Sequence, residues 1–203
     1  ADVAIEVRDN EPSFVSRGGK KLDQALDAFG IACADLVVMD VGASTGGFTD
    51  CVLQRGARRV YAVDVGYGQL AWKLRSDDRV VVLERENIRH LAHEKVPELV
   101  DMAVIDCSFI GLEKVLPPTT RFLRPGATVV PLVKPQFQVG ADRVGKGGVV
   151  RDEAVRRAAI DDVRRVATEL GFEVVGGVDS ETHGPKGNVE HLLHLTYSAA
   201  SPS

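Results

Sequence analysis

An aspartate and a lysine stand at the ends of two aliphatic stretches. Asp106 closes "VDMAVID" (100–106), and Lys134 directly follows "ATVVPLV" (127–133). Burial of an ammonium group is costly unless a carboxylate pairs with it, and Asp106 is the obvious partner if the two stretches are neighbouring strands. Such a pair can take part in acid–base chemistry. A strand-end salt bridge without function is the alternative, but we favour the functional interpretation.

Two more charged residues come from segments that we expect to fold over the same edge. They are Lys21 in "SRGGKKL" and Glu190 in "GNVEHLLHL". Taken singly, each is better explained as a surface charge. Together with Lys134 and Asp106, they would form a cluster of two amines and two acids.

A loop of small residues, "DVGASTGGFTD" (40–50), follows the first aliphatic stretch. Its glycines let the backbone approach a ligand closely. It lacks the Gly-Lys-Ser/Thr of a phosphate-binding loop and the middle glycine of a dinucleotide-binding loop. S-adenosylmethionine, which has no phosphate, is the remaining common nucleoside ligand. The alternative is an ordinary glycine turn after a strand.

An acid at the end of the next aliphatic stretch strengthens the cofactor interpretation. Asp64 in "AVDVG" can accept both hydroxyls of a ribose, and "ENIR" is placed to flank an adenine through Asn87 and Ile88. An acid at a strand end is otherwise often only solvated. The residues expected to contact the cofactor are Gly42, Ala43, Ser44, Gly46, Gly47, Phe48, Asp64, Val65, Asn87, Ile88 and Asp106.

The elements that must position these residues follow from the hydrophobic pattern. Aliphatic stretches that are apolar almost throughout predict strands buried on both faces, and hence a parallel sheet. They span 36–41, 59–65, 79–84, 100–106 and 127–133, with amphipathic segments between most of them. We expect helices at 20–31, 46–57 and 151–172, and a helix at 111–123 that breaks at its prolines. The tail (173–180 and 189–197) predicts an antiparallel strand pair. The fold class is α/β, doubly wound and Rossmann-like.

Composition excludes several classes of protein. The chain has 203 residues, of which 44% are hydrophobic and 27% charged, as in soluble globular domains. No apolar run approaches the roughly 20 residues of a membrane span, and no signal peptide is evident. The net charge of -4 argues against a general nucleic-acid binder but permits a local basic face. Cys33, Cys51 and Cys107 have no metal-ligand spacing, so we expect free thiols, no metal and a cytoplasmic location.

Six ordered motifs give the chain a specific resemblance. "SRGGKKL", "DVGASTGGFTD", "AVDVGYGQL", "VIDCSFI", "LVKPQFQVG" and "GNVEHLLHL" are similar to those of the TlyA-type, FtsJ-related ribosomal RNA 2′-O-methyltransferases. The resemblance implies a class I methyltransferase fold over residues 15–197, with a seven-stranded, mostly parallel sheet and a C-terminal antiparallel hairpin. It also implies S-adenosylmethionine as cofactor and ribosomal RNA, with cytidine the favoured nucleoside, as substrate.

The same resemblance implies a Lys-Asp-Lys-Glu tetrad and a domain arrangement. By motif position the tetrad is Lys21, Asp106, Lys134 and Glu190. Members of the family carry an N-terminal S4 RNA-binding domain, and we expect residues 1–14 to be its remnant or a linker. Residues 198–203 would be a disordered tail.

The tetrad suggests a mechanism, in which a ribose 2′-hydroxyl attacks the sulfonium methyl group. An amine accepts a proton only while it is neutral, and burial and a neighbouring ammonium both favour the neutral form. We assign Lys134 to orient and deprotonate the hydroxyl, Asp106 and Lys21 to set its charge state, and Glu190 to position Lys21 or the ribose. The two lysines could exchange roles, because such a cluster titrates as a unit.

Basic residues gather in loops expected at the same edge. A rim for RNA phosphates is predicted at Arg17, Lys20, Arg143, Lys146 and Lys186. Phe137 or Phe109 could stack on a flipped base, although core packing is the preferred interpretation of Phe109. The arginine pairs of 151–172 alternate with acids and predict a solvated helix face.

Three other classes of function compete with this interpretation: a different enzyme, a membrane-active protein and an RNA-binding module without catalysis. The glycine spacing disfavours a nicotinamide-dependent reductase, and "DCSF" differs from the Asn-Pro-Pro-type motif of base-directed methyltransferases. TlyA-like proteins have also been called haemolysins, which would make the chain membrane-active, but no segment supports insertion. An RNA-binding module without catalysis would not need the tetrad or the glycine loop.

Overall fold

The computed structural model describes residues 14–140, 143–184 and 186–198. The predicted remnant at 1–14 and the predicted tail at 198–203 therefore lie outside the described residues, except for Phe14 and Ser198. Those two predictions concern parts of the chain about which the structure gives no information.

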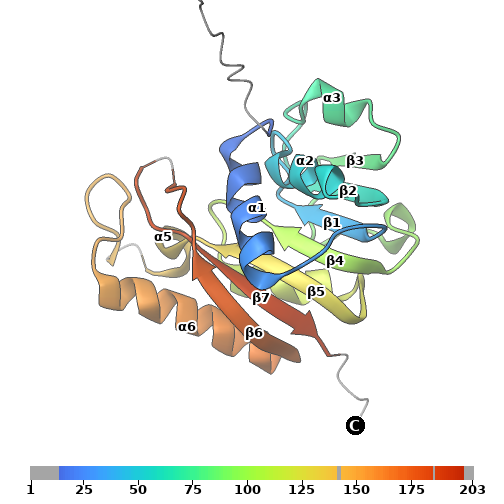
Figure 1. The fold of residues 1–203 in the computed structure, drawn as a ribbon. Coiled ribbons are helices and arrows are strands. Elements are labelled where there is room, and N and C mark those ends of the chain that lie inside the picture. Colours follow the sequence, from blue (N-terminus) through green and yellow to red (C-terminus); the bar gives the residue numbers. More distant parts are fainter. Residues whose placement is uncertain (1–13, 141–142, 185, 199–203) are drawn as a thin grey trace, which may run out of the picture.

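A single seven-stranded sheet forms the centre of the described chain, in the order β3-β2-β1-β4-β5-β7-β6 (Figure 1). All neighbouring pairs are parallel except those made by β7, which is antiparallel to both β5 and β6. The predicted class and the terminal antiparallel pair are confirmed. The strands are β1 (Val37–Val41), β2 (Arg59–Asp64), β3 (Val80–Glu84), β4 (Val100–Ile105), β5 (Leu123–Val133), β6 (Phe172–Asp179) and β7 (His191–Tyr197).

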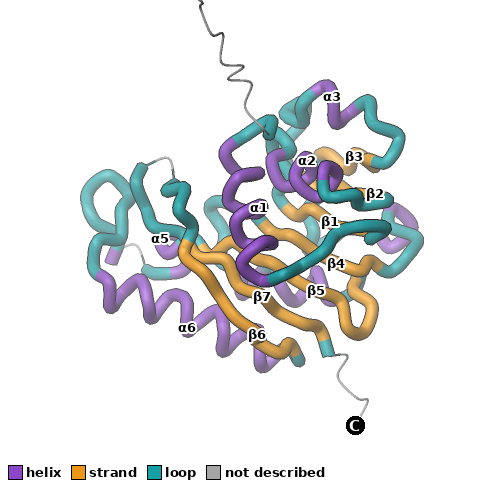
Figure 2. Tube along the Cα trace, in the orientation of Figure 1, coloured by secondary structure: helices purple, strands orange, loops and turns teal. Residues whose placement is uncertain are grey.

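Helices cover both faces of this sheet, and long loops gather where the strands end (Figure 2). The α-helices are α1 (Arg17–Phe29), α2 (Gly47–Gln54), α3 (Trp72–Arg75), α4 (Leu116–Thr120), α5 (Pro135–Gln138) and α6 (Glu153–Glu169), and the short 3₁₀ turns are η1 (His93–Lys95) and η2 (Leu112–Lys114). Gly30 ends α1 in the left-handed conformation, close to the predicted end of this helix.

The apolar pattern of β1 explains why the sheet is buried on both sides. Val37, Met39 and Val41 belong to the core on one face of the sheet, and Val38 belongs to the core on the other face, which also contains residues of α1 and α2. All five residues of β1 are buried. The strand therefore cannot move without disturbing two cores, so its carboxyl end is a rigid support for the glycine loop that follows.

The segment 111–123 differs from its prediction. The prolines do not interrupt a helix but begin one: α4 has Pro117 in its first turn and ends at Thr120. The first turn of a helix has no carbonyl partners for its backbone N–H groups, so proline is tolerated there. β5 then starts at Leu123, earlier than expected.

The long C-terminal helix is confirmed with shorter bounds than 151–172. The Asp152 carboxylate caps α6 by accepting hydrogen bonds from the N–H groups of Ala154 and Val155. Within the described ranges, no helix combines the length and apolar character needed to cross a membrane.

Candidate active site

The carboxyl ends of β1, β4 and β5 meet at one edge of the sheet, as the strand order requires. The Asp106 N–H donates to the carbonyl oxygen of Val41 at 3.0 Å, which brings the glycine loop beside the end of β4. A Cβ added to Gly42 would lie 2.6 Å from the Asp106 carbonyl oxygen, and Gly42 has a φ of 85°. Only glycine suits that position, because both the space and the backbone conformation exclude a side chain.

The predicted pair of Lys134 and Asp106 forms. Lys134 Nζ lies 2.5 Å from Asp106 Oδ1 and donates to Ser108 Oγ at 2.9 Å. The two strand ends are held in register by the pairing of β4 with β5. The Asp106 side chain is 24% exposed, so a substrate can reach this pair.

The other two residues of the predicted tetrad also form a pair. Lys21, in the first turns of α1, places Nζ 2.5 Å from Oε2 of Glu190, just before β7. These residues are 169 positions apart in the chain, and Glu190 is only 1% exposed. A buried ion pair of this kind is retained only if both partners stay in place.

All four charged residues line one cavity of about 550 Å³, together with Gly42, Ala43, Ser44, Gly47 and Phe48 of the glycine loop. A second cavity of about 410 Å³ is lined by Asp64, Val65, Asn87 and Ile88. The two cavities share lining residues at Gly42, Ser44, Asp106, Ser108 and Phe109. The arrangement is therefore one elongated site with an amine-and-acid end and an acid-lined end.

The Asp64 carboxylate already has two backbone partners. One oxygen accepts from the Ser44 N–H at 2.7 Å and the other from the Gly66 N–H at 2.6 Å. A carboxylate has about four acceptor positions, so two remain for ligand hydroxyls. Asp64 thus also ties the glycine loop to the loop after β2.

Gly46 is the one predicted cofactor residue that lines neither cavity. It precedes α2 with a φ of 96°, and an added Cβ would lie 2.3 Å from the Leu74 side chain. Its part in the loop is to allow the turn and the close packing of α3. The structure brings the other ten residues to the site.

Asp40 lies in β1, directly before Val41 and Gly42, and is fully buried. Its Oδ2 accepts from the Thr49 hydroxyl at 2.7 Å, and its Oδ1 has no hydrogen-bond partner. Burial raises the pKa of Asp40 to about 7, against the opposing effect of the Thr49 hydrogen bond. The charges of Asp106 and Asp64 raise it further, so Asp40 is a neutral or half-charged support beneath two acids of the site.

The preferred interpretation of Phe109 as a core residue is wrong. Its side chain is 90% exposed, and its φ of 64° turns it away from the core. A positive φ is rare for a bulky residue and marks a constrained loop. The ring lies 5.0 Å from that of Phe137, and both line the cavity that holds the tetrad.

The predicted basic rim is only partly assembled. Arg17 and Lys186 line the mouth of the larger cavity. Lys20, Arg143 and Lys146 are exposed but line neither cavity. The face of α6, in contrast, is a solvated network of arginines and acids, as predicted.

Ser108 and Asn188 are among the lining residues of the site that the sequence did not reveal. Ser108 is bonded to Lys134, and Asn188 is buried and joins two loops through bonds to the Val150 N–H and the Gly148 carbonyl oxygen. Ser108 stands two positions after Asp106 and Asn188 two before Glu190 in the sequence. Proximity to those acids was the only available signal, and it does not specify a contact.

Comparison with known proteins shows which family the chain is similar to. The family model of the FtsJ-like methyltransferases matches residues 14–197. The 16S/23S rRNA (cytidine-2′-O)-methyltransferase TlyA of Mycobacterium tuberculosis is 53% identical over 189 residues, which are 93% of this chain and 70% of that protein. Hemolysin A of Brachyspira hyodysenteriae is 41% identical over 94% of this chain and 80% of its own length. A solved structure from Streptococcus thermophilus superposes with a TM-score of 0.90 at 44% identity, over 95% of this chain and 70% of that one.

The strand order of the sheet and the matching family model define a Rossmann-like methyltransferase. The chain belongs to the FtsJ-like methyltransferase family.

Proposed function

We propose that the chain transfers a methyl group from S-adenosylmethionine to a ribose 2′-hydroxyl of ribosomal RNA, with cytidine the favoured nucleoside. The observation that carries the proposal is the elongated site, in which two lysine–carboxylate pairs lie beside an acid-lined cavity. The names of the methyltransferase relatives support the RNA substrate and the position of the methyl group.

The chemistry of the smaller cavity fits the cofactor. Its lining holds Asp64, Glu86 and Asp106 and, among the described residues, no lysine or arginine. A dinucleotide would bring a pyrophosphate into this acidic surrounding, whereas the cofactor carries a positive sulfonium. Asp64 would hold the ribose, and Asn87 and Ile88 the adenine. Bound there, S-adenosylmethionine supplies a methyl group that a nucleophile can accept directly.

The residues of the larger cavity would orient and deprotonate the 2′-hydroxyl. Lys134 orients the 2′-hydroxyl and takes its proton as the new O–C bond forms, while Asp106 and Ser108 fix the direction of Nζ. That step needs the neutral form of the Lys134 amine. Glu190 holds Lys21 in place, so the second pair acts behind the first.

The exposed loops around the cavity would meet the RNA. Arg17, Lys20, Arg143, Lys146 and Lys186 would bind phosphates, and Phe109 with Phe137 offers a ring pair on which a flipped base can stack. The predicted S4 domain would add affinity for RNA in a longer protein.

The test is methyl transfer from labelled S-adenosylmethionine to isolated ribosomal subunits, preceded by calorimetry with the cofactor. We expect cofactor binding and label in RNA, with the chain alone and with a version extended by an S4 domain. Alkaline hydrolysis locates the methyl group, since a 2′-O-methyl group protects the next phosphodiester and a base methyl group does not. Label released entirely in mononucleotides would contradict a ribose target.

The name of one relative, Hemolysin A, suggests membrane activity as a second candidate function. Dye release from liposomes, measured beside methyl transfer, separates the two. Leakage at concentrations that give no methyl transfer would favour the membrane function over the enzymatic one.

A further inference from the structure

Lys21 and Glu190 come from opposite ends of the chain, so other contacts must hold α1 in place beside Glu190 for this pair to form. Helix α1 is anchored to α2 by Arg55, which binds the carboxylates of Asp23 and Asp27. That anchor lies on the side of the helix facing α2. Toward β7, the ring of Phe29 at the C-terminal end of α1 lies 5.3 Å from that of His194. Nearer to Lys21, α1 also has a polar connection to the chain between β6 and β7, where Glu190 lies.

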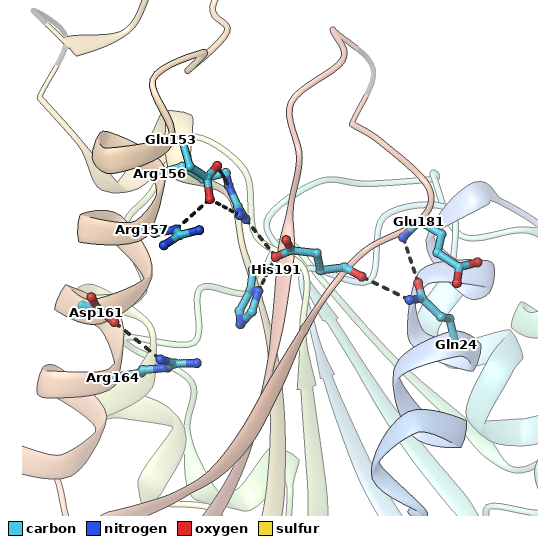
Figure 3. A network of polar contacts seen from close by, with 9 residues as sticks. Gln24, Glu153, Arg156, Arg157, Asp161, Arg164, Glu181 and His191 are labelled. Atoms are coloured by element: carbon cyan, nitrogen blue, oxygen red, sulfur yellow. Dashed lines mark hydrogen bonds and ion pairs between the residues drawn. The ribbon is translucent and has the colours of Figure 1, made fainter.

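Gln24 makes that connection. It lies three residues after Lys21, so both side chains leave neighbouring positions on one side of α1. Its Nε2 donates to the carbonyl oxygen of Asp179 at 3.1 Å, and its Oε1 accepts from the Glu181 N–H at 3.0 Å. Figure 3 shows Gln24 reaching from its helix to the chain at Glu181. The carboxamide therefore pairs with the chain leaving β6 much as a neighbouring strand would.

The segment 179–181, to which Gln24 is hydrogen-bonded, is also hydrogen-bonded to Glu190. Between the two bonded residues, Ser180 donates its N–H to the carbonyl oxygen of Glu190 at 2.8 Å. Asp179 and Glu181 thus bind Gln24, and Ser180 between them binds Glu190. These hydrogen bonds fix α1, which carries Lys21, relative to the backbone of Glu190.

Asp179 is itself held in place from the other side of the sheet. Its Oδ1 lies 2.8 Å from Arg156 Nη1 of α6 and 2.6 Å from His191 Nδ1 of β7. Burial favours a higher pKa for Asp179, but hydrogen bonds from Arg156 and His191 outweigh it, and the pKa lies below its ordinary value. Figure 3 shows Arg156 and His191 converging between α6 and the strands. The anchor of Gln24 is therefore fixed to α6 and β7.

We propose that Gln24 is a positioning residue of the methyltransferase: its carboxamide sets the distance between Lys21 and Glu190 and, through that pair, the arrangement around Lys134. The inference rests on the proposed function, because it gives a catalytic purpose to the second ion pair. It adds to the site a residue that lines neither cavity.

Loss of the carboxamide should lower the rate of methyl transfer rather than cofactor affinity. We expect Gln24→Ala to reduce kcat by roughly 10- to 100-fold, the effect of a small misplacement of catalytic groups. The Kd for S-adenosylmethionine should stay within about twofold, because no contact of the acid-lined cavity changes. Gln24→Glu keeps an acceptor for Glu181 but loses the donor to Asp179, so its loss should be intermediate. Asp27→Ala removes another polar contact of α1, on the side of Arg55, and serves as the matched control with kcat near wild type.

A double-mutant cycle with Glu190→Gln separates positioning from general destabilisation. If Gln24 acts through the pair, Gln24→Ala should change kcat by less than about twofold once Glu190→Gln has weakened the pair. The same factor in both backgrounds, or unchanged kcat in Gln24→Ala, would overturn the inference.

Lys134→Ala in the same assay distinguishes the failure of the proposed function. If Lys134→Ala transfers methyl at the wild-type rate, the assignment of the site fails whatever Gln24 does. If Lys134→Ala is inactive and Gln24→Ala is fully active, only the role of Gln24 is refuted. A crystal structure of Gln24→Ala gives a readout independent of activity: a direct contact between Lys21 Nζ and Glu190 Oε2 at an unchanged separation would also refute it.

Discussion

The two ends of the elongated site are built in different ways. The acid-lined end, where we propose that the cofactor binds, is called the cofactor end below. It is made by the carboxyl ends of parallel strands and the loops that directly follow them, and most of its residues lie within 41–44, 63–69, 86–88 and 106–110. The tetrad end takes one residue each from α1, β4, β5 and the approach to β7. The first end depends on local backbone conformation, and the second on the docking of remote elements. Substitutions at the two ends should therefore have separable effects on binding and on rate.

The largest effect is expected at Lys134. Lys134→Ala should lower methyl transfer by roughly 100-fold or more, because the hydroxyl loses the group that takes its proton. Cofactor binding measured by calorimetry should remain near that of the wild type. Retention of a tenth of the wild-type rate would remove Lys134 from this role, and a parallel loss of cofactor affinity would erase the distinction between the two ends.

The second largest effect concerns stability. Glu190→Ala leaves the ammonium of Lys21 buried without its partner, which typically costs about 3–5 kcal/mol in unfolding free energy. Chemical denaturation should show this loss. The double variant Lys21→Met with Glu190→Ala, which removes both charges, should recover part of it while staying inactive. A stability equal to that of the wild type in Glu190→Ala would show that the pair is not buried as the structure has it.

A smaller effect is expected at the cofactor end. Asp64→Ala should weaken S-adenosylmethionine binding by roughly 10- to 100-fold, since the ribose hydroxyls and the Ser44 N–H lose a charged acceptor. The rate at saturating cofactor should fall much less than the affinity. Calorimetry combined with initial rates at high cofactor concentration gives both numbers. A fall in kcat without a change in Kd would contradict the separation of the two ends.

A pH effect tests the support beneath the site. The folded-state pKa of Asp40 is raised to about 7 from the usual value near 4, so the folded protein binds a proton that the unfolded chain releases between these values. This contribution to stability is complete below pH 4 and is lost as the pH rises to 7. The Asp40→Asn variant has no ionisable group at this position. The difference in unfolding free energy, wild type minus variant, should therefore fall as the pH rises from 4 to 7. A difference that is flat over this window would refute the raised pKa.

The smallest effect is expected at the RNA rim. Lys146→Ala should leave cofactor binding unchanged and reduce RNA affinity by a few-fold, with a slightly shallower dependence on salt. Binding titrations at two or more salt concentrations measure both changes. Lys95, which is paired with Glu86, is a matched control, and Lys95→Ala should alter neither. An unchanged salt slope in Lys146→Ala would exclude this lysine from the phosphate rim.

Local patterns were sufficient for the sheet and for the cofactor end. Strands with apolar residues on both faces must be buried centrally, and this fixed the parallel core and the confirmed hairpin at its edge. The glycine loop could be placed because a strand end, a turn and a helix start are adjacent in sequence. Segment 111–123 was mispredicted, because proline both interrupts and begins helices and only its position in the turn distinguishes the two.

The amino-acid sequence by itself determined which charges were available and, through the family motifs, which four belonged together. The sequence also predicted the pair of Lys134 with Asp106. Only the tertiary structure decided that Lys21 pairs with Glu190, that Phe109 points outward, and that Gln24 links α1 to the chain after β6. The physical reason is the distance along the sequence over which each interaction acts. Hydrophobic periodicity and turn chemistry act over a few residues, whereas a hydrogen bond between residues about 155 positions apart exists only after the sheet has brought both segments to one edge.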